Sequence, residues 1–168
     1  MNAQRTSAVF IGIDGTLNVR QCESGAELLR HETGSAGGYS IHAVREVVDW
    51  LCGLHAADME LIWSTTWNEQ ADVYAGWFGL PRELPYLKHS GANRVSFGRS
   101  LKVAPVLDYL GAHPEIHKAV VLDDVVGEYG FENARSSGGR LLIPELAEEF
   151  GITSAVRADV DAFLGLSR

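Results

Sequence analysis

The stretch AVFIGIDGTL, residues 8–17, decides the fold of this 168-residue chain. Its first six residues are apolar or glycine and include three β-branched side chains, which indicates a fully buried strand rather than a helix. The run breaks at Asp14-Gly15-Thr16, a sequence typical of a turn. We therefore expect this strand at the centre of a sheet, with polar side chains at its end.

Other short apolar runs along the chain are also predicted to be strands. They cover residues 61–63, 84–87, 119–122 and 141–143. Pro85 confines the second of these to an edge of the sheet, because proline cannot donate to the strand ladder.

Amphipathic helices are expected between these strands. They cover 41–51, 67–78, 105–110, 144–150 and 154–164, with Ser40, Thr66 and Thr153 as caps and a capping box between Thr66 and Glu69. Residues 18–40 show little periodicity and are predicted to be a loop, with one helical turn near 26–29. The alternation predicts an α/β, three-layer Rossmann-like domain. Its central parallel sheet has about five strands, with helices on both faces.

Composition bounds the class of protein. With 46% apolar and 21% charged residues, we expect one globular domain over 1–168. Fourteen basic against 22 acidic residues give a formal charge of −8, which disfavours phosphate backbones and anionic lipid. No window reaches the ~18 apolar residues of a membrane span, so we expect a soluble, cytoplasmic protein. Cys22 and Cys52 show no metal-binding spacing, and free thiols are favoured over one disulfide between them.

Polar residues end the predicted strands, where parallel sheets bind ligands. They are Asp14 with Thr16, Ser64 with Thr65, and Asp123 with Asp124. Each has a plainer reading on its own, as a turn, a helix cap or solvated loop carboxylates, and Lys102 alone is an ordinary surface charge.

Taken in order, these residues resemble the haloacid dehalogenase-like superfamily of phosphohydrolases. Its first motif, Asp-x-Asp-Gly-Thr-Leu after a buried strand, corresponds to GIDGTL at 12–17. The second, a Ser or Thr ending the next strand, matches Thr65, with Ser64 as the other register. The third, a Lys often within Lys-Pro-x-Pro, matches Lys102-Val103-Ala104-Pro105, and the acidic fourth matches Asp123-Asp124.

A narrower likeness concerns LIWSTTW at 61–67, with Gly79-Leu80-Pro81 after the next helix. This is similar to a small actinobacterial-type group of these domains, some of them associated with RNA repair. Larger family members insert a cap domain at the place of residues 18–40, so a loop there implies an open site without a folded cap. Uncapped members act on large substrates or recruit a partner protein as a lid, which is an inference by analogy.

The resemblance implies Mg²⁺-dependent hydrolysis of phosphomonoesters through an aspartyl-phosphate. Asp14 would be the general acid and base and would offer its backbone carbonyl to the metal. Asp123 would be the carboxylate ligand of Mg²⁺, with Asp124 as a second ligand or its neighbour. Lys102 would clamp the phosphoryl charge and Thr65 would hydrogen-bond the phosphate. The implied phosphate-binding residues are Gly15, Thr16, Ser64, Thr65, Thr66 and Lys102.

The chain departs from the family at the nucleophile, whose position is taken by Gly12. A frame in which Asp14 is the nucleophile would put Thr16 in the acid–base role and is disfavoured. Three accounts remain: a natural pseudoenzyme that keeps a phosphate site, a phosphatase silenced by an Asp-to-Gly change, or hydrolysis by water that Asp14 activates. The expected ligand is a phosphorylated small molecule or nucleic-acid end, the alternatives being a binding module or a subunit whose partner covers the site. Loss of the carboxylate at position 12 would weaken the Mg²⁺ site.

Other candidates have competing interpretations. Trp63 and Trp67 flank the second motif, where they would stack on a base or, more plainly, pack in the core. A basic rim for an anionic ligand, or simply a solvated loop, would be formed by Lys88, His89, Arg94 and Arg99. The acidic residues Glu145, Glu148 and Glu149 are predicted to be a solvated helix face.

Overall fold

The computed structural model describes residues 5–34, 38–89, 95–96 and 98–167. Its main sheet has four parallel strands in the order β4-β1-β7-β8. Their bounds are β1 Ser7–Ile11, β4 Glu60–Trp63, β7 Lys118–Leu122 and β8 Leu141–Leu142. Ile11 at the end of β1 is paired with both Trp63 and Leu122, so the carboxyl ends of three strands lie level.

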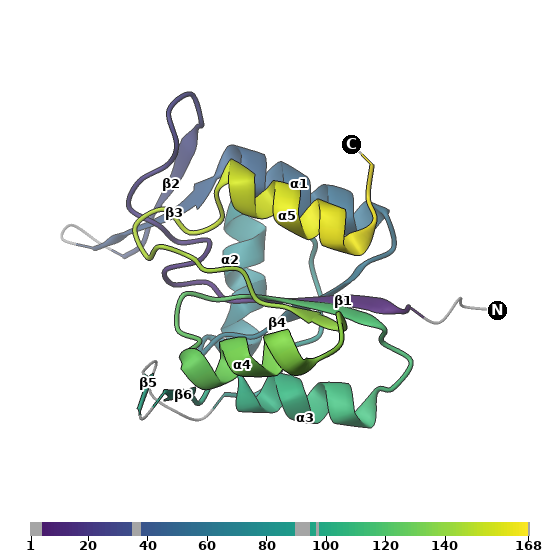
Figure 1. Ribbon diagram of the computed structural model, residues 1–168. Helices are drawn as coiled ribbons and strands as arrows, with labels where there is room; N and C mark the ends of the chain where they lie inside the picture. The colour runs from purple at the N-terminus through teal and green to yellow at the C-terminus, as the bar shows by residue number, and fades with distance from the viewer. Residues whose placement is uncertain (1–4, 35–37, 90–94, 97, 168) are drawn as a thin grey trace.

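Helices cover both faces of the sheet (Figure 1). On one side lie α1 (Arg45–Ala56) and α5 (Ser154–Leu164), and on the other α3 (Ala104–Ala112) and α4 (Glu128–Ser136). Helix α2 (Ala71–Phe78) follows a 3₁₀ turn, η1 (Asn68–Gln70), and packs into the same buried cluster as α1 and α5. The predicted α/β architecture with a parallel sheet is confirmed at this level, and it is compatible with a Rossmann-like fold.

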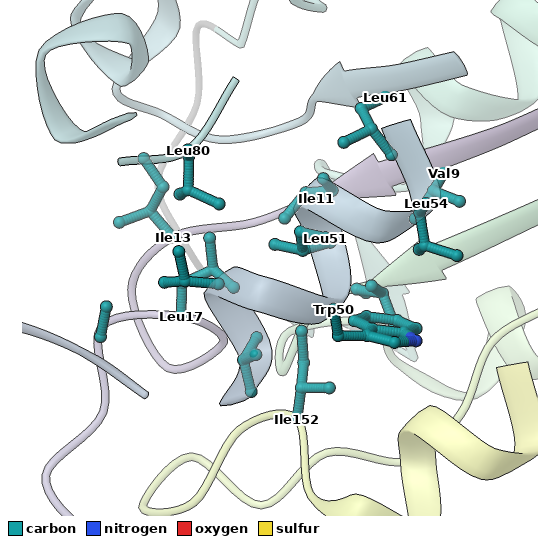
Figure 2. Close-up of a cluster of buried hydrophobic side chains, with 14 of the residues drawn as sticks. Val9, Ile11, Ile13, Leu17, Trp50, Leu51, Leu54, Leu61, Leu80 and Ile152 are labelled. Atoms are coloured by element: carbon teal, nitrogen blue, oxygen red, sulfur yellow. The ribbon is translucent and has the colours of Figure 1, made fainter. Parts of the chain in front are cut away.

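Strand β1 supplies side chains to two cores. Val9 and Ile11 join the larger cluster with α1, α2 and α5, whereas Ala8 and Phe10 join the cluster beneath α3. Figure 2 shows the larger cluster, in which Ile11 lies near Leu51 and Val9 near Leu54 of α1. This two-sided burial is the reason why β1 is a continuous apolar run.

The region predicted as a loop, residues 18–40, instead contains a strand. Strand β2 (Leu28–Glu32) pairs in antiparallel fashion with β3 (Ser40–Val44), and α1 begins only at Arg45. The helical turn near 26–29 and the helix start at 41 were therefore wrong, and Ser40 is not a helix cap. Ile41 fits the apolar positions expected of a helix. It also fits the inside–outside alternation of a strand, because Ile41 is buried and the next residue, His42, is only partly buried.

Two further helix predictions were wrong in part. Thr66 and Glu69 form no capping box, because η1 intervenes and α2 starts at Ala71 without a side-chain cap. Residues 144–150 form no helix; Ala147 and Gly151 make a single antiparallel bridge instead. The cap at Thr153 is confirmed, since its side chain accepts a hydrogen bond from the Val156 amide at the start of α5.

The strand count also differs. Residues 84–87 contribute one bridge, between Tyr86 and Trp63, so the described sheet has four strands and not about five. Helix α4 was not predicted, because only Gly130 within it is buried and few of its residues are apolar. A short hairpin of β5 (Val95–Ser96) and β6 (Arg99–Ser100) precedes α3.

Two further predictions from the sequence, on the cysteines and on membrane-spanning helices, can be compared with the structure. Cys22 and Cys52 are free thiols, as favoured. Within the described ranges, every helix is too short or too polar to cross a membrane.

Candidate functional site

The carboxyl ends of β1, β4 and β7 bring three of the four motif segments together. Hydrogen bonding continues one residue beyond the strands: the Gly12 amide donates to the Leu122 carbonyl (2.9 Å) and the Ser64 amide donates to the Ile11 carbonyl (2.8 Å). The residues that follow these strands therefore meet at one edge of the sheet, as predicted. Lys102, which precedes α3, reaches the same edge and contacts Asp123.

The turn after β1 is wound tightly around one carbonyl. The Ile13 carbonyl accepts from the amides of Thr16 (3.1 Å), Leu17 (2.8 Å) and Asn18 (2.9 Å). Gly15 adopts a φ of 71°, and a Cβ there would lie 2.2 Å from Oδ2 of Asp124. The glycine is thus required both by the turn and by the close approach of the Asp124 carboxylate.

Asp14 is exposed and held in place by two donors. Its Oδ1 accepts from Nδ2 of Asn18 (2.9 Å) and its Oδ2 accepts from the indole Nε1 of Trp67 (2.8 Å). Trp67 also meets Tyr74 and Trp77 edge to face, so it combines packing with a polar contact to the site. Of the two interpretations of Trp63, core packing is confirmed, since only 2% of it is exposed.

Gly12 lies against a buried ion pair. The Nζ of Lys102 is 2.6 Å from Oδ2 of Asp123, and the two side chains are 5% and 3% exposed. A Cβ on Gly12 would lie 2.7 Å from that same Oδ2 and 3.1 Å from Oγ1 of Thr16. Oδ2 is ion-paired with Lys102, and Oγ1 of Thr16 is buried without a hydrogen-bond partner among the described residues. The space that an aspartate side chain would enter is therefore bordered by the same Asp123 oxygen that pairs with Lys102.

Burial dominates the electrostatics of the acidic pair. It raises the pKa of Asp123 to about 6, against the lowering effect of Lys102 and of the Val125 amide, which donates to Oδ1 at 2.8 Å. The pKa of Asp124 is also raised by burial, with Lys102 lowering it and Glu148 raising it. The three carboxylates of Asp14, Asp123 and Asp124 and the ammonium of Lys102 together carry a formal charge of −2 at this edge of the sheet.

Ser64 and Thr65 are buried beside an unpredicted partner. The hydroxyl of Ser64 lies 3.0 Å from Nε2 of His89, a residue only 7% exposed whose pKa is lowered by burial and by the charge of Lys102. Asn68 clamps His89, since its Oδ1 accepts from the His89 amide (2.8 Å) and its Nδ2 donates to the carbonyl (3.0 Å). Oγ1 of Thr65 accepts from the amide of Trp67 at 3.3 Å.

The remaining phosphate-binding and rim candidates are scattered. Thr66 is exposed and lies outside the buried cluster. Of the four rim residues, His89 points inward, Lys88 is exposed, and the Arg99 guanidinium lies 4.7 Å from the ring centre of Tyr129. Arg94 lies outside the described residues. The described part of the chain therefore does not assemble the basic rim.

The described side chains do not by themselves complete the Mg²⁺ ligand set that the resemblance implies. Across the described ranges, no three His, Cys, Asp or Glu side chains are grouped so that they could hold a metal. Asp14 is engaged by Asn18 and Trp67, Asp123 is paired with Lys102, and position 12 offers no side-chain oxygen. Mg²⁺ is held by octahedral oxygen ligands. Of the implied side-chain ligands, Asp124 alone keeps an oxygen, Oδ1, that is buried with neither a cation nor a hydrogen-bond donor beside it among the described residues.

A cavity of about 360 Å³ adjoins Asp14. It is lined by Asp14, Gly15, Asn18, Val19, Arg20, Ser40, His42, Glu148 and Glu149. Ser40 and His42 come from the hairpin β2–β3, and the two glutamates come from the segment that was predicted to be a helix. Sequence reasoning missed these residues because no local pattern marks side chains that only the tertiary fold brings together.

The predicted site residues thus fall into two groups. Gly12, Thr16, Lys102 and Asp123 form a buried cluster, whereas Asp14 lies exposed at the adjoining cavity. No protein-family model, curated protein or solved structure matches the chain.

Proposed function

We propose that this chain is a phosphohydrolase scaffold of the haloacid dehalogenase-like type in which hydrolysis through an aspartyl-phosphate is lost. Two observations support the scaffold. The motifs follow one another in the family's order along the chain, and a parallel sheet brings their residues to one edge. Ligands of such sheets bind at this edge.

The surroundings of Gly12 carry the proposal of lost hydrolysis. A covalent mechanism needs a carboxylate at this position, and Oδ2 of Asp123 would lie only 2.7 Å from the Cβ of such a residue. Lys102, the cation that would neutralise the charge of the phosphoryl oxygens, is paired with Asp123 instead. Among the described residues, this site then offers neither a carboxylate at position 12 nor an unpaired Lys102, and loss of a nucleophile costs several orders of magnitude in rate.

Direct activation of water by Asp14 is the weaker account. Both of its carboxylate oxygens already accept a hydrogen bond, from Asn18 and from Trp67. A water at Asp14 would share these acceptors, and it would attack without help from Lys102. We therefore favour loss of the hydrolytic activity over slow hydrolysis through Asp14.

Three versions of the chain test the proposal with an aryl phosphate and Mg²⁺. We expect background turnover for the native chain and for Gly12→Ala, which adds a Cβ but no carboxylate. We expect Gly12→Asp to gain at least about a hundredfold, because the new carboxylate competes with Asp123 for Lys102 and supplies the nucleophile. Circular dichroism verifies that each variant is folded.

Either of two results contradicts the proposal. Turnover by the native chain at about 1 s⁻¹ or more, an ordinary rate for an enzyme, would show that hydrolysis is intact. A folded Gly12→Asp variant without any gain would show that the scaffold is not that of a phosphohydrolase.

Binding of a phosphorylated small molecule or nucleic-acid end without turnover is the second candidate. It is favoured by Oγ1 of Thr16, a hydroxyl on a residue only 2% exposed, to which no described residue offers a hydrogen bond. The formal charge of −2 opposes it, since a phosphate dianion would be repelled. Calorimetry with inorganic phosphate, with and without Mg²⁺, distinguishes the two: heat of binding by the native chain supports the second candidate. A partner protein over the site remains a prediction.

A further inference from the structure

We infer that the ammonium group of Lys102 is the resident cation of this site and stands in place of a divalent metal. The inference rests on the proposed function for the identity of the site, and on the contacts of Lys102, Asp123 and Gly12 for the rest. It predicts that this chain does not respond to Mg²⁺ and that removal of the lysine charge creates a response.

The first support is the burial of the pair. Lys102 and Asp123 are 5% and 3% exposed and their charged atoms are 2.6 Å apart. A buried carboxylate that already has a cation at this distance gains little from a second one. Separating the two would leave an ammonium uncompensated in a buried place, which is strongly unfavourable.

The second support is that both members of the pair are anchored to one another's segments. The Lys102 amide donates to Oγ of Ser100 (3.1 Å), and that hydroxyl donates to the Val125 carbonyl (2.6 Å). The Val125 amide in turn donates to Oδ1 of Asp123 (2.8 Å). The hydrogen bonds and the ion pair close a ring, so the fold itself holds Lys102 against Asp123.

The third support is the glycine at position 12. Oδ2 of Asp123 would lie 2.7 Å from a Cβ there, so any residue other than glycine at position 12 would crowd the Asp123 carboxylate. An aspartate at this position would add a second carboxylate near Lys102, and this carboxylate would weaken the ion pair between Lys102 and Asp123. Gly12 therefore removes a metal ligand and also permits the ion pair that replaces the metal.

The experiment measures thermal unfolding of the full chain with MgCl₂ or MnCl₂ as the only added ligand. We expect no rise in melting temperature for the native chain. Lys102→Met should gain a clear rise, because Asp123 is then left without a cation, and calorimetry should show Mg²⁺ binding at least about tenfold tighter than native. Gly12→Asp should gain a rise as well, through the added carboxylate.

The matched control is Lys118→Met. Lys118 lies at the opposite end of β7, where its ammonium donates to the Phe163 carbonyl rather than to a carboxylate. This variant changes net charge as Lys102→Met does, so a response to Mg²⁺ in both would mean non-specific binding to an acidic protein. That result would overturn the inference, as would a folded Lys102→Met variant without a response.

A rise in the melting temperature of the native chain that disappears in Asp123→Asn would also overturn it. If Lys102→Met does not fold, Gly12→Asp and the native chain still decide the matter by calorimetry: native binding equal to that of Gly12→Asp refutes the inference. The proposed function and this inference can fail independently. Metal binding without turnover by the native chain contradicts this inference alone. Metal binding without turnover by Gly12→Asp contradicts the proposed function alone.

Discussion

At the scale of single residues, Asp123 couples the stability of the molecule to pH. Burial raises its pKa to about 6 in the folded chain, against 3.8 for an ordinary aspartate. Because the folded state binds this proton more tightly, the contribution to stability is complete below about pH 4 and is lost as pH rises through about 6. The total loss is about 3 kcal/mol.

Denaturant unfolding at about pH 4.5 and about pH 7.5 checks this. We expect the native chain to lose about 2 kcal/mol more of its free energy of unfolding over this interval than Asp123→Asn. Carboxylates with a lowered pKa, such as Glu23 and Asp72, titrate in both proteins and cancel in the comparison. Equal losses in the two proteins would refute the coupling.

Gly15 makes a second prediction at this scale, with Gly79 as its control. Both have positive φ, 71° and 76°, but only Gly15 has a neighbour within reach of a Cβ, the Asp124 carboxylate at 2.2 Å. Gly79→Ala should cost about 1–2 kcal/mol for the left-handed backbone. Gly15→Ala should cost at least about 1 kcal/mol more, because Asp124 must also move. Equal melting temperatures of the two variants would contradict this.

At the scale of elements, an aromatic stack fastens the hairpin β2–β3 to α2. The rings of His31 and Trp77 lie 4.3 Å apart and nearly parallel, at 16°. The hydroxyl of Tyr74 adds a hydrogen bond to the His42 carbonyl (2.7 Å). The hairpin carries Ser40 and His42 to the cavity beside Asp14, so this attachment shapes the candidate site.

Trp77→Ala should therefore release the hairpin without unfolding the sheet. An aromatic stack is worth about 0.5–1.5 kcal/mol, so amide exchange in β2 should become up to about tenfold faster. Exchange in β1, which lies at the centre of the sheet, should stay unchanged. Equal acceleration in β1 and β2 would mean that Trp77 supports the whole fold rather than the hairpin.

The elements that sequence could predict are those whose burial shows in the local pattern. Strands β1 and β7 are continuous apolar runs, and Thr153 marks the start of α5 by an ordinary cap. The hairpin was missed because Ile41 fits two periodicities, and its pairing with His31 in the neighbouring strand decides between them. Helix α4 was missed because it buries only Gly130.

The candidate site was predictable as a set of segments but not as a set of contacts. The motif order placed Gly12, Lys102 and Asp123 near one another, and they do meet. That Lys102 pairs with Asp123, or that His89 lies against Ser64, depends on distances between segments far apart in the sequence. No local periodicity encodes such distances.

At the scale of the whole molecule, one sheet joins two cores. Strand β1 places Val9 and Ile11 in one cluster and Ala8 and Phe10 in the other, and β7 is shared likewise, with Val120 and Val121 on opposite sides. Neither cluster can lose its packing without exposing residues of the strands that hold the other. We therefore expect a single cooperative unfolding transition.

Calorimetry of the native chain and of Phe10→Ala tests this. The substitution empties space only in the smaller cluster and should cost about 3–5 kcal/mol. Even so, we expect one transition, with calorimetric and van't Hoff enthalpies that agree. Two resolved transitions in the variant would show that the cores melt independently.

The indole of Trp67 has a consequence of a different kind. Its N–H donates to Asp14 at the mouth of the cavity, whereas Trp63 is sealed in the core and the N–H of Trp50 donates to the distant Asp161. Any ligand that draws Asp14 away alters the polarity at the Trp67 indole, which also meets the ring of Trp77 edge to face, and shifts the fluorescence emission. The intrinsic fluorescence of Trp67 therefore reports on occupancy of the site, and the Trp67→Phe variant is the control that should lose this signal.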